Sequence, residues 1–113
     1  GLSLLVSDGA EIREIKGTRQ GIGFASFQNG VSFSLRELEI HPGTAFYMAT
    51  DGLRDQVGEK TGLPFGRTRL KDLLASVQSL TMRDQKDRIL HVFNEYKGEE
   101  SVRDDIALFG FRI

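Results

Sequence analysis

The stretch "TAFYMATDGLRD" (residues 44–55) decides the fold, because it joins an apolar run directly to an acid and a glycine. Residues 45–49 are apolar without interruption, which is consistent with a strand buried on both faces. Asp51 and Gly52 follow after Thr50. Asp-Gly is a common turn at the end of a strand, but the same position would also hold a carboxylate at a sheet edge for chemistry. This stretch alone leaves both interpretations open.

Composition limits the kinds of protein that this chain can be. Its 113 residues suffice for one small domain, and 39% hydrophobic residues with 27% charged residues allow a core in water. A net charge of −1 gives no electrostatic case for binding nucleic acid or an anionic membrane. The absence of cysteine excludes disulfides, thiol catalysis and cysteine-ligated metals. We find no signal peptide and no membrane-spanning run, so we expect a cytoplasmic location, or the cytoplasmic domain of a membrane-anchored parent protein.

Strand signals dominate the first half of the chain. "LSLLVS" (residues 2–7), followed by Asp8-Gly9 and then "EIREI" (residues 11–15), predicts a β-hairpin. The glycine-rich "KGTRQGIGF" (residues 16–24) predicts a loop and lacks the phosphate-binding P-loop pattern. "VSFSLRELEI" (residues 31–40) alternates apolar and polar residues, which predicts a strand with a bend near its middle.

The second half carries helix signals and a final strand. One helix is predicted by apolar residues at i, i+3, i+4 and i+7, with Thr68 as a possible N-cap: Leu70, Leu73, Leu74 and Val77. A second helix is predicted to begin after Thr81, with Asp84 in a variant of the capping box, and to end at Gly98. "IALFGFRI" (residues 106–113) predicts a strand that is apolar on both faces. These elements indicate a mainly antiparallel α+β fold with two helices.

Three acids stand at predicted strand ends: Asp51 after one strand, and Asp104 and Asp105 before another. If these two strands are neighbours, the carboxylates converge and repel one another unless a cation lies between them. Mg²⁺ and Mn²⁺ prefer such oxygen ligands, and a water that they bind becomes a nucleophile near neutral pH. The pattern therefore suggests metal-assisted hydrolysis. The alternative is an ordinary turn at Asp51 and a solvated acidic pair. His41 and His91 have no metal-ligand spacing.

The order of motifs resembles a known family. "FYMATDGLRDQ" (residues 46–56), then "FGRTRLKDLL" (residues 65–74), then a helix and "RDDIALFGFRI" (residues 103–113) resemble the C-terminal half of SpoIIE-type phosphatase domains. These belong to the metal-dependent type 2C serine/threonine phosphatases. "DGLRDQVG" with "FG-x-x-R" is most similar to the SiaA-like branch, which is attached to membrane sensor modules. The resemblance covers nearly the whole chain, and it implies half of an α-β-β-α layered sandwich.

The resemblance also implies roles for particular residues. Asp51 and Asp104 would bind one metal of a two-metal Mn²⁺ or Mg²⁺ centre, with Asp105 in a supporting metal-binding role. Gly52 would permit the turn that aims Asp51. The implied reaction is hydrolysis of phosphoserine or phosphothreonine by a metal-activated water. The implied substrate is a small bacterial regulatory protein, such as a STAS-type anti-sigma-factor antagonist. Residues 56–66 are expected to form a mobile loop near the substrate.

One departure from the family pattern is serious. The family's N-terminal half supplies an Asp-Gly motif that bridges both metals, and none precedes Asp51 here, since Asp8-Gly9 fits the hairpin turn. Residues 1–113 therefore correspond to the C-terminal part of the domain, expected to bind metal weakly alone and to associate with the missing N-terminal half or a second copy. A catalytically silent interaction module of the same fold is the alternative. An unrelated β-rich domain would instead place Asp51 far from Asp104.

Overall fold

The structure is a computed structural model that describes residues 2–9, 11–17 and 35–113. In these ranges the chain forms four strands and three helices, which confirms the α+β class. In chain order they are β1 (Ser3–Ser7), β2 (Ile12–Lys16), β3 (Ala45–Ala49), α1 (Asp51–Asp55), α2 (Gly66–Ser76), α3 (Met82–Lys97) and β4 (Leu108–Arg112).

The four strands form one antiparallel sheet in the order β2-β1-β3-β4. The predicted hairpin is confirmed by pairing of β1 with β2, and Gly9 turns the chain between them with a φ of 102°. Strand β3 lies between β1 and β4, so its backbone is paired on both sides. The neighbouring strands therefore fix where each end of β3 lies.

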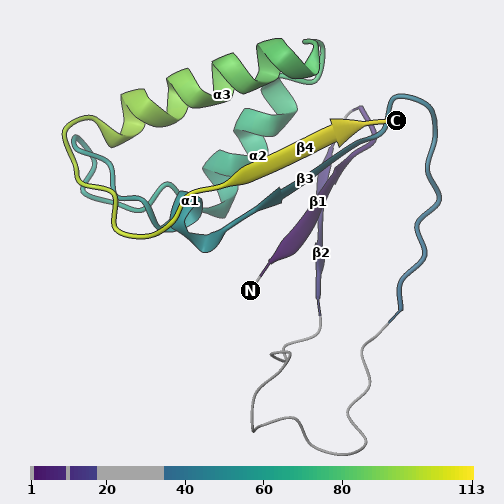
Figure 1. Cartoon of the computed structure of the whole chain (residues 1–113), viewed down its shortest axis with the longest axis horizontal. Coiled ribbons are helices and arrows are strands. Elements are labelled where there is room, and N and C mark those ends of the chain that lie inside the picture. Colours follow the sequence, from purple (N-terminus) through teal and green to yellow (C-terminus); the bar gives the residue numbers. More distant parts are fainter. Residues whose placement is uncertain (1, 10, 18–34) are drawn as a thin grey trace, which may run out of the picture.

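Helices α2 and α3 lie on one face of the sheet, where they enclose the hydrophobic core (Figure 1). Alternate strand residues point into this core, as the period of two in a strand requires. The predicted apolar stripe of α2 faces the sheet, and α1 adds Leu53. The buried core comprises Leu5, Ala45, Tyr47, Ala49, Leu53, Phe65, Leu70, Leu73, Leu74, Val77, Ile89 and Phe93.

Tyr47 is the residue that joins the sheet to the helices. It lies opposite Gly110, where an added Cβ would stand 2.7 Å from the Tyr47 ring, so the glycine leaves room for the ring. The Tyr47 hydroxyl donates a 2.6 Å hydrogen bond to Gln85 Oε1 in α3 and accepts one of 2.8 Å from Gln78 Nε2. Both Tyr47 and Gln85 are fully buried, so this polar contact fixes α3 against β3.

The other face of the sheet is buried at Val6 and Phe46, but among the described residues it is exposed toward β4. Phe109 is 63% exposed, Phe111 is 44% exposed and Met48 is 41% exposed. Phe111 stacks on Phe46 with ring centroids 5.1 Å apart. The prediction that β3 is buried on both faces thus fails at Met48. Large apolar side chains thus gather on the exposed part of this face.

Several local predictions differ from the structure. Helix α2 begins at Gly66 after Phe65, so Thr68 is not its N-cap. The predicted strand over residues 31–40 is absent from its described part, residues 35–40, where the Leu35 side chain is 88% exposed and therefore has no surface to pack on. Residues 31–34, and residues 18–24 of the predicted glycine-rich loop, lie outside the described residues.

Two other boundaries are informative. The cap of α3 is confirmed, because Asp84 N donates to Thr81 Oγ1 at 3.2 Å and Gly98 ends the helix with a φ of 56°. The turn expected at Asp51 is instead the start of the short helix α1. This third helix was not expected, because a single helical turn carries too little periodicity to be detected in a sequence.

Replacing Tyr47 by phenylalanine tests the sheet–helix contact. Loss of the hydroxyl leaves buried Gln85 Oε1 without its donor, which should lower the free energy of unfolding by about 1–3 kcal/mol. Urea denaturation of the intact protein measures this. Tyr96→Phe is the control, because water can replace its more exposed hydroxyl. Equal losses in the two variants would contradict the role given to Tyr47.

Candidate functional site

All three acids predicted for the site lie at the same end of the sheet. Asp51 begins α1 directly after β3, while Asp104 and Asp105 precede β4. Because β3 and β4 are antiparallel, the end of one lies beside the start of the other. The three acids line one open depression of about 290 Å³, together with Leu2 and Thr50. The structure thus brings together the residues that the two motifs supply.

Thr50 fastens the two segments that carry the acids. Its backbone N–H donates to the Ala107 carbonyl at 3.0 Å, and its hydroxyl accepts a bond of 2.9 Å from Ala107 N. The same hydroxyl donates to the Asp105 carbonyl at 2.8 Å. One backbone bond and two hydroxyl bonds thus continue the β3–β4 pairing beyond the ends of the two strands. The Thr of the TDG motif therefore holds the DD segment in place.

Gly52 has a different role from the one that the resemblance implied. It is not among the glycines with positive φ in the described chain, so no unusual turn requires it. A Cβ at this position would instead overlap the Asp105 carbonyl and lie 3.1 Å from the Asp104 carbonyl oxygen. Glycine is needed because the backbone of residues 104–105 packs directly on α1. Gly52 therefore permits close approach of the two motifs.

The charge of Asp51 is held by Arg54, one helical turn further on. Arg54 Nη2 donates to Asp51 Oδ1 at 2.8 Å, and this bond is the main cause that lowers the pKa of the Asp51 carboxyl from its usual value. The Asp51 side chain is 46% exposed, so it remains accessible from the depression. Asp104 Oδ1 accepts a 2.7 Å bond from Asp105 N, which orients that carboxylate.

The donor atoms suit a divalent metal in kind but not in number. Carboxylate oxygens of Asp51, Asp104 and Asp105 are the hard ligands that Mg²⁺ and Mn²⁺ prefer. Within residues 2–9, 11–17 and 35–113, however, no three acidic or histidine side chains are arranged to hold an ion. A metal bound here needs further ligands from water or from elsewhere in the protein.

A charged cluster beside the site was missed in the sequence. Glu14 in β2 has a side chain only 6% exposed, and three cations from α1 and α2 surround it: Arg54, Arg67 and Lys71. Arg67 Nε lies 2.9 Å from Glu14 Oε2. Glu14 lies two residues after Ile12 in β2, so both side chains point to the helix-covered face. An acid at such a core-facing position is the sequence signal that could have revealed this cluster.

Residues 56–66, predicted to form a mobile loop near the substrate, are held by several hydrogen bonds. Gly58 N donates to the Leu63 carbonyl at 3.0 Å, and Phe65 N donates to the Gln56 carbonyl at 2.8 Å. The Tyr96 hydroxyl in α3 also donates to the Leu63 carbonyl at 2.6 Å. Composition suggested flexibility, but two of these hydrogen bonds close the segment on itself and the bond from Tyr96 joins it to α3.

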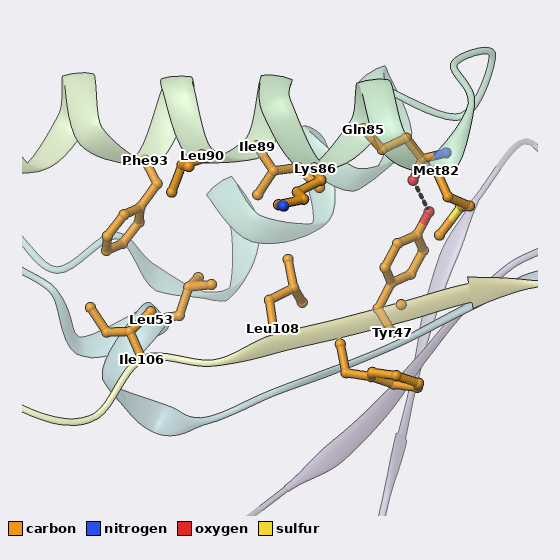
Figure 2. Close-up of a pocket in the computed structure, with 12 residues that line it drawn as sticks. Tyr47, Leu53, Met82, Gln85, Lys86, Ile89, Leu90, Phe93, Ile106 and Leu108 are labelled. Carbon is orange, nitrogen blue, oxygen red and sulfur yellow. Dashed lines mark hydrogen bonds between the residues drawn. The ribbon is translucent and has the colours of Figure 1, made fainter.

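A larger apolar cavity of about 430 Å³ lies between α3 and β4, and none of the three acids lines it. Figure 2 shows its helix side, with Ile89 and Phe93 pointing toward Leu108 and Ile106, and with the Tyr47–Gln85 hydrogen bond at one end. The residues that line it are mainly core residues, and Lys86 is its one charged lining residue among those described. The cavity is a packing gap between α3 and the sheet, and its apolar lining offers no catalytic group.

Comparison with known proteins agrees with this geometry. A family model described as Stage II sporulation protein E (SpoIIE) matches residues 2–113. The chain belongs to the SpoIIE family. This assignment confirms the resemblance found in the motifs and excludes an unrelated β-rich domain.

A solved structure and a curated search complete the comparison of this SpoIIE-family chain. The SiaA-PP2C domain of Pseudomonas aeruginosa is similar at 36% sequence identity with a TM-score of 0.84, over 99% of this chain and 43% of that one. The chain therefore spans less than half of that solved domain. A search of curated proteins gave no match. None of the described helices is long and apolar enough to cross a bilayer.

Gly52→Ala tests whether the two motifs need close approach. The new Cβ must push residues 104–105 away from α1, so we expect lower stability by about 1–3 kcal/mol and weaker binding of Mn²⁺ in the intact protein. Thermal unfolding and calorimetric titration measure the two effects. Gly17→Ala is the control, because its Cβ would meet only Leu2 O at 3.7 Å. Unchanged metal binding in Gly52→Ala would contradict the packing argument.

Proposed function

We propose that this chain is the C-terminal part of a metal-dependent protein serine/threonine phosphatase domain that works in the cytoplasm. The observation that carries the proposal is the convergence of Asp51 with Asp104 and Asp105 at the β3–β4 edge. Membership of the SpoIIE family supports it, as does similarity to a PP2C domain. The match to 43% of that domain supports assigning the remaining ligands to another part of the protein.

The proposed roles follow from the positions of the side chains. Asp51 and Asp104 are metal ligands, and Asp105 supports them from the same depression. Thr50 and Gly52 keep the two carboxylate-bearing segments together. Mn²⁺ or Mg²⁺, when bound, supplies an acidified water and neutralises charge on a phosphoryl group. Phosphorylated serine or threonine is the proposed substrate, on a bacterial regulatory protein of the STAS type.

We further propose that the open face of the sheet packs against the rest of the domain or against a second copy of the chain. Met48, Phe109 and Phe111 form this face, and all three are more than 40% exposed. Exposed apolar side chains of this size favour burial, at about 25 cal/mol for each Å² removed from water. Covering this face would complete the second half of a layered sandwich.

A catalytically silent interaction module is the second candidate function. The observation that favours it is the lack, in the described residues, of three side chains arranged around one metal position. Metal binding by the intact protein separates the two candidates. Tight binding supports the enzyme, and partner binding that is indifferent to metal supports the module.

Removing the charge of a proposed ligand tests the enzymatic function. Asp51→Asn in the intact protein should lower Mn²⁺-dependent hydrolysis of a phosphoserine substrate by about 100-fold or more, because it removes a ligand and its negative charge. Asp55→Asn is the matched control, since Asp55 is exposed at the far end of α1 and lies outside the depression. Equal turnover in wild type and Asp51→Asn would refute the assignment.

Phe109→Lys tests whether the open face is covered in the intact protein. If it is covered, a buried lysine should lower the free energy of unfolding by about 2 kcal/mol or more. If Phe109 stays 63% exposed, the change should be within about 0.5 kcal/mol. Leu63→Lys, at a side chain 56% exposed on a loop, is the control measured by the same urea denaturation.

A further inference from the structure

Arg54 lies between two carboxylates and contacts them unequally. Its Nη2 donates to Asp51 Oδ1 at 2.8 Å, which is a short charge-assisted hydrogen bond. Its Nη1 lies 3.6 Å from Glu14 Oε1, which is an ion pair but too long for a hydrogen bond. The guanidinium is therefore committed to the exposed acid and only adjacent to the buried one.

Glu14 has an acceptor atom that no described residue satisfies. Its Oε1 is buried and lacks a hydrogen-bond partner in the described chain, whereas its Oε2 lies 2.9 Å from Arg67 Nε. A buried carboxylate oxygen without a donor is destabilising. Among the described residues, Arg54 is the cation that forms an ion pair with this atom.

A divalent cation at Asp51 would change the balance between these two contacts. The metal and the Arg54 guanidinium carry like charges, and both require oxygen atoms of the same carboxylate. Movement of Arg54 toward Glu14 reduces that repulsion and satisfies Oε1 at the same time. Contact with Asp51 thus suits Arg54 in the metal-free site, and contact with Glu14 suits it in the metal-bound site.

We propose that Arg54 is a positioning residue that exchanges partners, holding Asp51 without metal and moving to Glu14 when a divalent cation binds Asp51. The proposal rests on the proposed metal-binding role of Asp51. Glu14 then acts at a distance, because it stabilises the position that Arg54 must take to release Asp51. Metal binding and the Arg54–Glu14 contact strengthen each other by the same factor, as linkage requires.

Calorimetric titration of the intact protein with Mn²⁺, without substrate, tests the exchange through affinity alone. Arg54→Met removes the competitor and should tighten Mn²⁺ binding by about fivefold or more. Glu14→Gln removes the charge that attracts Arg54 and should weaken binding by a similar factor. In the Arg54→Met background, Glu14→Gln should have little effect, because the two residues act through one contact.

Lys71→Met is the matched control for charge. Lys71 Nζ lies 3.9 Å from Glu14 Oε2 and lies outside the depression that holds Asp51, so its loss should change Mn²⁺ affinity by less than about twofold. An equal gain in Lys71→Met and Arg54→Met would show a general charge effect and overturn the exchange. Weaker binding in Arg54→Met would overturn it too, because Arg54 would then be a fixed support. If Glu14→Gln does not fold, the comparison of these two variants still decides.

The design separates failure of the exchange from failure of the proposed function. If Asp51→Asn leaves Mn²⁺ binding unchanged, Asp51 is not a ligand, and both proposals fail. If Asp51→Asn abolishes binding while Arg54→Met leaves the affinity at the wild-type value, only the exchange fails. Tighter binding in Arg54→Met together with loss of binding in Asp51→Asn supports both.

Discussion

Antiparallel pairing of β3 with β4 is the constraint on which the candidate site depends. It places the residue after one strand beside the residues before the other, although Asp51 and Asp104 lie far apart in the chain. The strands pair as far as Ala49 and Leu108, and beyond them Thr50 continues the connection through its backbone N–H and its hydroxyl. Local packing at Gly52 then sets how closely the two segments approach. The site therefore lies where β3 ends and β4 begins, and α1 packs against it.

The strand that leads to Asp51 is anchored to the helix layer. Tyr47 in the middle of β3 is buried and bonded to Gln85 of α3, and Gly110 of β4 gives its ring room. A sliding motion of β3 against α3 would break that buried hydrogen bond, which is costly in a low-dielectric interior. The arrangement separates a stable helix-covered face from an open apolar face. The helix-covered face thus supports the site, while Met48 and Phe109 lie exposed on the opposite face.

Sequence patterns predicted the parts of this fold that depend on period and local chemistry. The hairpin at Asp8-Gly9, the apolar stripe of α2 and the cap at Thr81 all follow from short-range rules, and the structure confirms them. The pair of acidic motifs was also visible, because each follows or precedes an apolar run. The strand predicted over residues 31–40 is absent from its described part, residues 35–40. Alternation of apolar and polar residues suits a strand, but it does not supply the neighbouring strand or layer that the strand must pack on.

The contacts around Asp51 could not be predicted, because they join residues that only the tertiary fold brings together. Arg54 appears in the sequence as one more surface charge, and Glu14 appears as an acid in a strand. In the fold, Arg54 lowers the pKa of Asp51, and the same guanidinium lies 3.6 Å from Glu14 Oε1. A carboxylate that binds a metal must be ionised and must also be released by whatever holds it ionised. The Glu14–Arg54–Asp51 series meets both requirements with one side chain that has two partners.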